Sequence, residues 1–317
     1  MDKNSNVLIT GGTGFIGSLL VNSFLKKDVC KKIILPVRNL TKAKKMYNDK
    51  KIVFVKTNLE ELCNISYKID YIIHCAAITR SNEMIEKPVE VADGIVIGTK
   101  NILELAKKKK IKSMVYVSSW EVYGDKKSED LLTENELGNI SLTSIRSCYP
   151  LSKRIAEHYC HLYWQEYEVP VKIARLAQVF GTGVRKDDTR IFMQIAKSVV
   201  DKKDIVLHTS GMSMGNYCAS EDMVSAVFTI LTKGESNETY NVVNEENTMR
   251  VKEMANLVAK KVAEGNIKVI CENKVADKFG YAPEKQARMS AEKLRGLGWM
   301  PSKNLEQMYR DIIAEIK

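Results

Sequence analysis

The chain has 317 residues, of which 44% are hydrophobic, a length that allows one large or two modest globular domains. Its net charge is +10, but its lysine runs, such as residues 107–110, lack the interleaved aromatic side chains of a nucleic-acid groove. No apolar run reaches the roughly 18 residues of a membrane span, and the N-terminus leads directly into a strand-like segment. We therefore expect no nucleic acid, no membrane and no signal peptide.

Cysteine and histidine usage argues against a disulfide framework and against a metal site. The seven cysteines include no Cys-x-x-Cys pair, their number is odd, and the four histidines are far apart. Reduced thiols in a cytoplasmic protein are the simplest interpretation, and we expect no metal ligands.

The first strand-like segment, residues 7–10, runs into a glycine-rich turn and then into a helical pattern. The turn reads Gly11-Gly12-Thr13-Gly14-Phe15-Ile16-Gly17. Gly11 permits the tight turn, Gly14 lets the backbone approach a pyrophosphate at the helix N-terminus, and Gly17 lets the helix pack closely on the sheet. The whole turn is therefore predicted to bind a dinucleotide.

The second and third strand-like segments end in further candidate cofactor residues. Arg38 follows the second strand, residues 32–37, at a position where NAD-binding folds usually have an acid. A guanidinium there suits a 2′-phosphate and stacks on adenine, so the sequence favours NADP over NAD. Asn58 and Leu59 follow the third strand and are also predicted to contact the cofactor.

A fourth strand is predicted within residues 70–77, and it ends in a turn of small residues. Ala76 and Ala77 allow a flat cofactor to lie against the backbone, where bulky side chains would clash. We interpret His74 as a packed residue at the strand end rather than as a catalyst.

A helical pattern over residues 91–105 precedes a fifth strand over residues 114–119. This alternation predicts an α/β fold with a doubly wound, Rossmann-type parallel sheet. Because ligands of such sheets bind at the carboxyl ends of the strands, Ser119 and Glu121 are expected in the active site.

Tyr149 and Lys153 are four residues apart in a helical pattern, so they share one face of a helix. An ammonium beside a phenol favours the phenolate and lowers the pKa of the tyrosine, which is near ~10 in water. The Ser119 hydroxyl can relay a proton or bond a substrate oxygen. The three residues predict a site for hydride and proton transfer, with Tyr149 as the base, Lys153 lowering its pKa and Ser119 orienting the substrate.

Several different short motifs are distributed along nearly the whole chain. They are the glycine turn, Ala76-Ala77, Gly98-Thr99-Lys100-Asn101, Ser118-Ser119-x-x-Val122-Tyr123-Gly124, Tyr149-x-x-x-Lys153, Arg175, Phe180-Gly181 and Leu297-Gly298-Trp299-x-Pro301. In these motifs the chain resembles an extended short-chain dehydrogenase/reductase of the nucleotide-sugar epimerase/dehydratase family. The resemblance implies a substrate that is a sugar linked to a nucleoside diphosphate. It also implies that Tyr149 is the base for the sugar hydroxyl, that Lys153 also bonds the nicotinamide ribose, and that Ser119 bonds the sugar oxygen.

The residues after Ser119 bear on which reaction is catalysed. Family dehydratases carry Asp-Glu there, whereas this chain has Trp120 and Glu121, which disfavours dehydration. Family decarboxylases of nucleotide-linked uronic acids carry a Glu at the place of Glu121 and an Arg-x-Cys-Tyr stretch similar to the one beginning at Arg146. Decarboxylation, as by a UDP-glucuronate decarboxylase, is therefore an alternative, although residues 150–152 differ from the decarboxylase pattern. Epimerisation at C4 is another alternative, because a 4-epimerase needs only the redox centre.

The resemblance further divides the chain into a cofactor-binding Rossmann domain, residues 1–180, and an interleaved nucleotide-sugar-binding domain, residues 181–317. Trp120, Glu121, Gln178 and Arg288 are assigned to the substrate in the same way. Gly215 replaces the arginine that usually grips the diphosphate, and Arg288 is the candidate for that role instead. The family's four-helix dimer interface also leads us to expect a homodimer.

The sequence thus predicts an NAD(P)-dependent oxidoreductase that transfers a hydride at C4 of a nucleotide sugar, as a 4-keto-sugar reductase or a 4-dehydrogenase. A regulator that senses NADP without chemistry is the non-enzyme alternative. The complete set of Ser119, Tyr149 and Lys153 argues against that alternative, because a sensor does not need all three.

Overall fold

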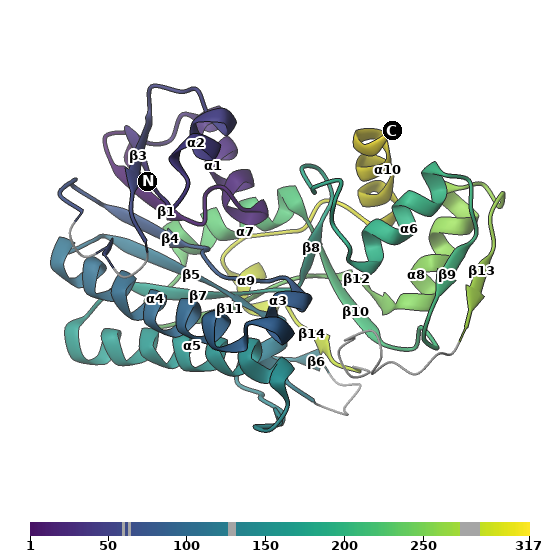
Figure 1. Cartoon of the computed structure of the whole chain (residues 1–317). Helices are drawn as coiled ribbons and strands as arrows, with labels where there is room; N and C mark the ends of the chain where they lie inside the picture. The colour runs from purple at the N-terminus through teal and green to yellow at the C-terminus, as the bar shows by residue number, and fades with distance from the viewer. Residues whose placement is uncertain (59–60, 63–64, 126–130, 273–285) are drawn as a thin grey trace. The chain divides into compact units, whose positions relative to one another are not determined.

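The computed structural model describes residues 1–58, 61–62, 65–125, 131–272 and 286–317, and these residues form two compact units whose segments alternate along the chain (Figure 1). The first unit comprises Met1–Val122, Ile140–Arg175 and Val224–Tyr240, and the second comprises Tyr123–Asn139, Leu176–Met223 and Asn241–Lys317. The predicted domain boundary after residue 180 stays a prediction.

A seven-stranded sheet, with the strand order β11-β7-β5-β4-β1-β2-β3, forms the centre of the first unit. Its strands are β1 (Asn6–Thr10), β2 (Lys32–Val37), β3 (Ile52–Lys56), β4 (Tyr71–His74), β5 (Ser113–Ser119), β7 (Val171–Leu176) and β11 (Thr239–Val242). The pairings β3–β2, β2–β1, β1–β4 and β4–β5 are all parallel. The prediction of a doubly wound parallel sheet is confirmed.

The strand order reverses at β1. The chain passes from β1 to β2 and β3 on one side, and then returns to β4 on the other side of β1. Ligands of open α/β sheets bind outside the carboxyl ends of the strands at such a reversal. The turns after β1 and β4 are therefore the expected place for a cofactor.

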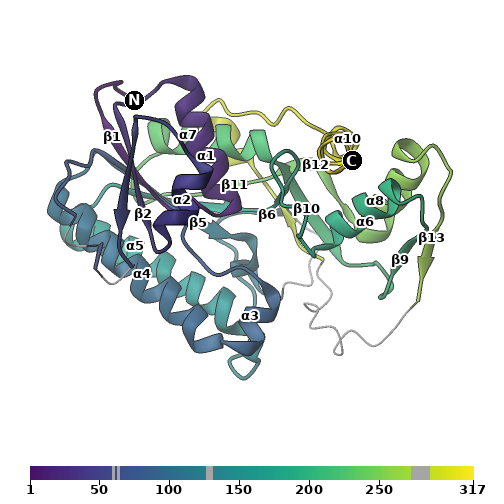
Figure 2. The same cartoon turned by 45° about the horizontal axis from the view of Figure 1, so that its top comes forward.

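Helices cover both faces of this sheet (Figures 1 and 2). They are α1 (Phe15–Lys27), α2 (Leu40–Met46), α3 (Ser81–Glu86), α4 (Pro88–Lys109), α5 (Cys148–Tyr167) and α7 (Ser220–Lys233). On one face α4 and α5 lie side by side, and Leu8 of β1 and Met114 of β5 join them in one hydrophobic core. On the other face α1 contacts α7, where the rings of Phe24 and Phe228 meet edge to face with centroids 5.8 Å apart.

Short strands and helices make up the second unit. Its elements are β6 (Leu131–Leu132), β8 (Gln178–Phe180), α6 (Ile191–Val200), β9 (Ile205–Leu207), β10 (Met214–Ala219), β12 (Asn244–Arg250), α8 (Val251–Leu257), β13 (Val269–Cys271), β14 (Arg288–Met289), α9 (Glu292–Gly296) and α10 (Leu305–Ile316). The strands pair as β12-β10-β8, β13-β9 and β14-β6. Phe180 lies at the core of this unit, since its ring stacks on Phe192 at 4.6 Å and meets Tyr309 edge to face at 5.2 Å.

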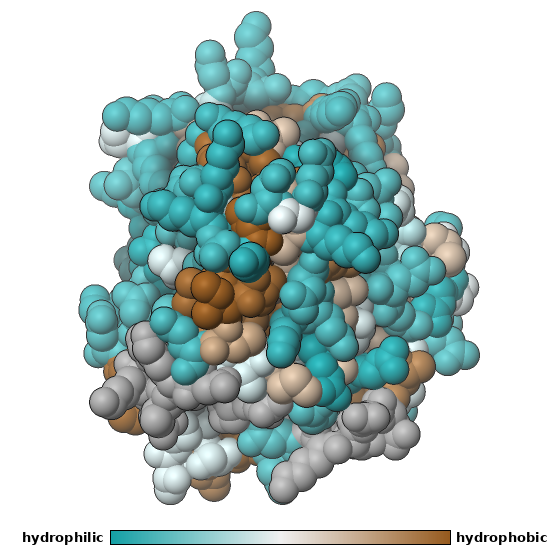
Figure 3. Space-filling view, turned by 90° about the vertical axis from the view of Figure 1, so that its right-hand side faces the viewer, coloured by the Kyte–Doolittle hydropathy of each residue, from teal (hydrophilic) through white to brown (hydrophobic). Residues whose placement is uncertain are grey.

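The face that Figure 3 shows is mainly hydrophilic, with a hydrophobic area near the middle of the view. Exposed apolar side chains of this unit include Val206 of β9 and Ile270 of β13, which are paired in register. Among the residues that the structure describes, no helix is both long and apolar enough to cross a membrane.

Candidate active site

The glycine turn between β1 and α1 has the close backbone packing that the sequence predicted. Gly11 has a φ of +69°, a conformation that L side chains rarely adopt. A Cβ on Gly17 would lie 2.2 Å from the carbonyl oxygen of Gly11, so no side chain fits there. Gly14 precedes α1, and no side chain of the described residues caps this helix. The start of a helix directs backbone N–H groups outward, a geometry that suits a pyrophosphate.

Tyr47 provides a contact to this turn that the sequence did not predict. The phenol of Tyr47, at the end of α2, donates a hydrogen bond of 2.5 Å to the carbonyl oxygen of Gly12. Burial raises the pKa of this phenol to about 12, so the phenol keeps its proton and remains a donor. α2 begins two residues after Arg38, the residue on which the predicted preference for NADP over NAD rests. This bond therefore connects the glycine turn to the segment that contains Arg38.

The other predicted cofactor residues follow β2, β3 and β4. Arg38 is exposed directly after β2. Asn58 is exposed after β3, and its side chain accepts a hydrogen bond from the backbone N–H of Glu61. Leu59 lies outside the described residues. Ala76 follows β4 and packs against the glycine turn, because a Cβ on Gly11 would lie 2.9 Å from its backbone nitrogen.

Tyr149 and Lys153 are both buried on α5, as the helical spacing predicted. The ammonium of Lys153 donates a hydrogen bond of 2.8 Å to the carbonyl oxygen of Val117 on β5. It lies 5.9 Å from the centre of the Tyr149 ring and 4.7 Å from the centre of the Tyr116 ring. A cation at this position favours the phenolate form of Tyr149.

Burial lowers the pKa of Lys153 to about 8, against the opposing influence of the Glu157 carboxylate. Removal from water disfavours the charged form of a lysine, whereas a nearby carboxylate favours it. Lys153 is therefore mainly a cation at neutral pH and loses its proton only a little above it.

A buried ion pair lies one helical turn beyond Lys153. Glu157 accepts a 2.5 Å hydrogen bond from the Ser118 hydroxyl and bonds of 2.7 to 3.2 Å from the guanidinium of Arg175. Removing one member of such a buried pair leaves an uncompensated charge, which typically costs roughly 3–5 kcal/mol. Arg175 was a recognised motif residue, whereas no local pattern indicated Glu157, because the contact joins α5 to β7.

Ser119 ends β5, and a short 3-10 helix, Trp120–Tyr123, follows it. The Ser119 hydroxyl accepts a hydrogen bond of 3.2 Å from the backbone N–H of Glu121. The Glu121 carboxylate forms an ion pair with Arg146, whose Nη2 is 3.0 Å from Oε1 and 2.9 Å from Oε2. Trp120 is buried. The structure thus joins Glu121 to the segment just before Tyr149.

Gln178 and Arg288 belong to the second unit. Gln178 begins β8 and is paired with Tyr217 of β10, while Arg288 is exposed at the start of β14. A Cβ on Gly215, where the resemblance leads one to expect an arginine, would lie 2.2 Å from the Tyr217 hydroxyl, so a side chain fits there only if Tyr217 moves. Within the described ranges, no cluster of three or more His, Cys, Asp or Glu side chains is placed to hold a metal ion.

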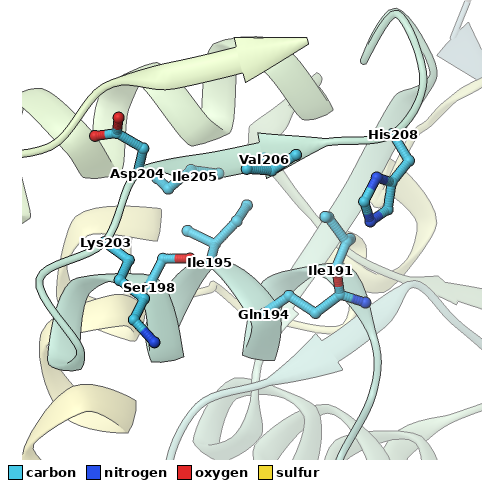
Figure 4. A pocket seen from close by; sticks show the side chains of 9 residues that line it. All are labelled: Ile191, Gln194, Ile195, Ser198, Lys203, Asp204, Ile205, Val206 and His208. Carbon is cyan, nitrogen blue, oxygen red and sulfur yellow. The ribbon is translucent and has the colours of Figure 1, made fainter. Parts of the chain in front are cut away.

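The second unit also has a recess of about 220 Å³ between α6 and β9 (Figure 4). It is lined by Ile191, Gln194, Ile195, Ser198, Lys203, Asp204, Ile205, Val206 and His208. Figure 4 shows His208 and Gln194 at one end of the recess and Lys203 and Asp204 at the other. None of these residues was a predicted site residue, and α6 was not predicted from the sequence.

Residues 7–243 match the model of the NAD dependent epimerase/dehydratase family. The chain belongs to this family. The match spans β1 to β11 and includes every predicted catalytic residue, so the family resemblance seen in the sequence motifs is confirmed. Members of this family are enzymes of the short-chain dehydrogenase/reductase type.

Individual relatives differ in the reactions after which they are named. The chain is 33% identical over 254 residues to a Dictyostelium discoideum protein named dTDP-D-glucose 4,6-dehydratase; the match covers 74% of this chain and 57% of that protein. It is 26% identical over 245 residues to the Arabidopsis thaliana UDP-glucuronic acid decarboxylase 6, covering 76% of this chain and 70% of the relative.

Solved structures of the family share the fold. The structure of a UDP-glucuronic acid 4-epimerase from Bacillus cereus, in complex with UDP-glucuronic acid and NAD, superposes with a TM-score of 0.82. The superposition covers 98% of each chain at 20% sequence identity, a level that establishes the fold alone.

Proposed function

We propose that the protein catalyses NAD(P)-dependent hydride transfer at C4 of the sugar of a nucleoside-diphosphate sugar. The observation that carries this proposal is the buried pair of Tyr149 and Lys153 on α5, beside the carboxyl end of β5. Relatives of the chain are named for reactions of dTDP-glucose and UDP-glucuronic acid, which supports a nucleotide sugar as the substrate.

Each catalytic residue has a distinct role in this proposal. Tyr149 takes the proton from the sugar hydroxyl during oxidation, or returns it during reduction. Lys153 favours the phenolate through its charge, and Ser119 bonds the same sugar oxygen and holds it near the phenol. The residues of the glycine turn fit a dinucleotide, since Gly14 and Gly17 leave the helix N-terminus open to a pyrophosphate. The nicotinamide, when bound, accepts or supplies the hydride.

Tyr149→Phe tests the proposal. We expect turnover to fall by about 10²–10⁴-fold, the usual contribution of a general base, while the dissociation constant for the cofactor stays nearly unchanged. Tyr159→Phe makes the same chemical change on the same helix and should leave turnover intact. Full activity in Tyr149→Phe would refute the mechanism.

Two outcomes of C4 chemistry fit this centre. Net reduction or oxidation, by a 4-keto-sugar reductase or a 4-dehydrogenase, is our first choice, and 4-epimerisation with a retained cofactor is the alternative. Dehydration is disfavoured because the buried Trp120 occupies the place of the dehydratase acid. This argument distinguishes the chain from its relatives that are named as dehydratases.

Decarboxylation of a nucleotide-linked uronic acid is a second candidate, and the ion pair between Glu121 and Arg146 favours it. The pair brings together the two segments that the chain shares with decarboxylases. Release of carbon dioxide from UDP-glucuronic acid, measured by mass spectrometry of the product, tests this candidate. An unchanged UDP-glucuronic acid after incubation with the active enzyme would exclude it.

For the cofactor, we propose NADP in preference to NAD. Support comes from Arg38, a guanidinium at the strand end where NAD-binding folds usually have an acid. Known members of the family bind NAD, as the complex of the Bacillus cereus enzyme does.

We also propose a homodimer that forms through α4 and α5. The exposed side of α5 includes Ile155 and Leu162, which are seven residues apart and therefore share one helix face. Ile97 of α4 is exposed as well. Apolar side chains on two adjacent helices are suited to packing against the same pair in a second copy.

A further inference from the structure

His74, the last residue of β4, is fully buried and makes hydrogen bonds through both ring nitrogens. Its Nδ1 lies 2.6 Å from the hydroxyl oxygen of Thr10, the last residue of β1. Its Nε2 lies 3.3 Å from the hydroxyl oxygen of Thr99 on α4. The proposed chemistry does not use this residue.

The hydrogen bonds of Thr10 determine which nitrogen of His74 carries the proton. The Thr10 oxygen accepts hydrogen bonds of 3.1 Å from two backbone donors, the N–H groups of Cys75 and Ala76. A hydroxyl oxygen has two lone pairs and one hydrogen, so both lone pairs are used. The hydroxyl hydrogen is then directed at Nδ1 of His74, which must be the unprotonated nitrogen. The proton is on Nε2, and Nε2 donates to Thr99.

The surroundings of His74 keep the ring neutral. Burial lowers its pKa to about 3, and the nearby Lys153 ammonium acts in the same direction. The Tyr116 ring lies 5.7 Å from the imidazole, and burial raises the pKa of its phenol well above the usual value. The Cys75 thiol also keeps its proton, because burial raises its pKa to about 12. None of these groups provides a negative charge that would stabilise an imidazolium.

Thr10 connects the two turns at the strand reversal. Gly11, which begins the glycine turn, follows it directly, and its hydroxyl oxygen holds the backbone of Cys75 and Ala76. The turns also touch, since a Cβ on Gly11 would lie 2.9 Å from the nitrogen of Ala76. Thr10 is therefore bonded to the turn after β4 and is continuous with the glycine turn.

We propose that His74, as the Nε2-protonated neutral tautomer, is a positioning residue that orients the Thr10 hydroxyl and thereby holds the two cofactor-binding turns in register. This inference rests on the proposed function in one respect, namely that these turns bind the cofactor. It predicts that an acceptor at the place of Nδ1 is required for cofactor affinity, whereas the bond from Nε2 to Thr99 is less important.

A matched pair of substitutions separates the two nitrogens. His74→Asn keeps an oxygen acceptor near the place of Nδ1, whereas His74→Gln keeps a polar group only near the place of Nε2. We expect the dissociation constant for NAD or NADP, measured by calorimetry, to rise by about tenfold in His74→Gln and to stay within about threefold in His74→Asn. Thr10→Val and Thr10→Ser form a second pair, with affinity lost in the first and kept in the second. Wild-type affinity in folded His74→Gln or Thr10→Val would overturn the inference.

The tautomer itself is measurable by NMR without any ligand. The chain has only four histidines, so the imidazole ¹⁵N signals of His74 are identified by their loss in His74→Asn. We expect a neutral Nε2–H pattern that does not change between about pH 5 and pH 8. An Nδ1–H pattern, or titration in that range, would overturn the role of His74 alone. A wild-type protein that binds neither NAD nor NADP would instead overturn the cofactor-binding role of the turns.

Discussion

Replacing Lys153 with methionine should make the cofactor-free protein more stable while abolishing its activity. Lys153 is 3% exposed, and burial lowers its pKa from 10.5 to about 8. Between these two values the unfolded chain binds a proton at this position that the folded protein does not bind. Stability therefore rises as the pH increases through this interval, and the cost of burying the charge is present in full below about pH 8.

The size of the effect follows from the pKa and from one hydrogen bond. The lowering from 10.5 to about 8 corresponds to about 3 kcal/mol of folding free energy. Methionine removes that cost but loses the bond to the carbonyl of Val117, which is worth about 1 kcal/mol. Lys153→Met should therefore stabilise the protein by about 2 kcal/mol at neutral pH. The advantage should shrink above about pH 8 and be lost as the pH approaches 10.5, because the lysine is then neutral in the folded protein and increasingly neutral in the unfolded chain.

Urea unfolding measures the difference in stability between the wild type and Lys153→Met. It is carried out near neutral pH and again near pH 10.5, the upper of the two pKa values. Lys172 offers a matched control: it is buried, its pKa is also lowered to about 8 by burial, and it bonds Ser113 at the amino end of β5, away from the proposed site. Lys172→Met should show the same pH-dependent stabilisation and keep its activity. A Lys153→Met protein whose stability relative to the wild type does not depend on pH would refute this reasoning.

Further predictions concern the packing of two glycines, the choice of cofactor and the assembly. Gly17→Ala should destabilise the protein by about 2 kcal/mol or more and weaken cofactor binding, since the new Cβ would meet the Gly11 carbonyl at 2.2 Å. Gly94→Ala, in open space within α4, should instead stabilise by up to about 1 kcal/mol, and urea unfolding compares the two. Arg38→Asp should lower the affinity for NADP relative to NAD in calorimetry; an unchanged ratio would argue against the NADP preference. If the proposed homodimer forms, Ile155→Asp should convert it into a monomer in light scattering at micromolar concentration. A wild type that is already monomeric would contradict the proposed dimer.

The first half of the fold was predictable because its signals are local. β1, β2 and β5 are runs of apolar and β-branched residues, and the glycine turn stands between a strand and a helix, as its chemistry requires. The helical spacing of Tyr149 and Lys153 likewise placed both on α5.

Two strands of the second unit, β10 and β12, lack such signals. β12 consists largely of polar residues, and β10 contains Gly215 and Asn216, so neither segment has an intrinsic preference for a strand. Pairing with β8 and β12 holds β10 in place, and the side chain of Asn216 adds hydrogen bonds to the backbone of Ala287 and Met289. Such contacts between distant segments are absent from any local pattern.

The contacts within the candidate active site could not be predicted from the sequence for the same reason. The sequence identified Glu121, Arg146 and His74 as separate residues, but the ion pair of the first two and the two hydrogen bonds of the third join segments that are 25 to 64 residues apart. These contacts depend on the packing of β1, β4 and α4 and on the segment before Tyr149. They became visible only in three dimensions.

The most direct test of the central claim is mass spectrometry of a panel of nucleoside-diphosphate sugars, incubated with the wild type and with Tyr149→Phe. Each protein is tested without added cofactor, with NADPH, and with oxidised NAD or NADP. Gain or loss of two hydrogens indicates reduction or oxidation, an isomer of unchanged mass indicates epimerisation, and loss of carbon dioxide indicates decarboxylation. We predict that the wild type converts at least one nucleotide sugar by a reaction that oxidises or reduces C4, and that Tyr149→Phe does not. Conversion by both proteins alike, or by neither, would contradict the account.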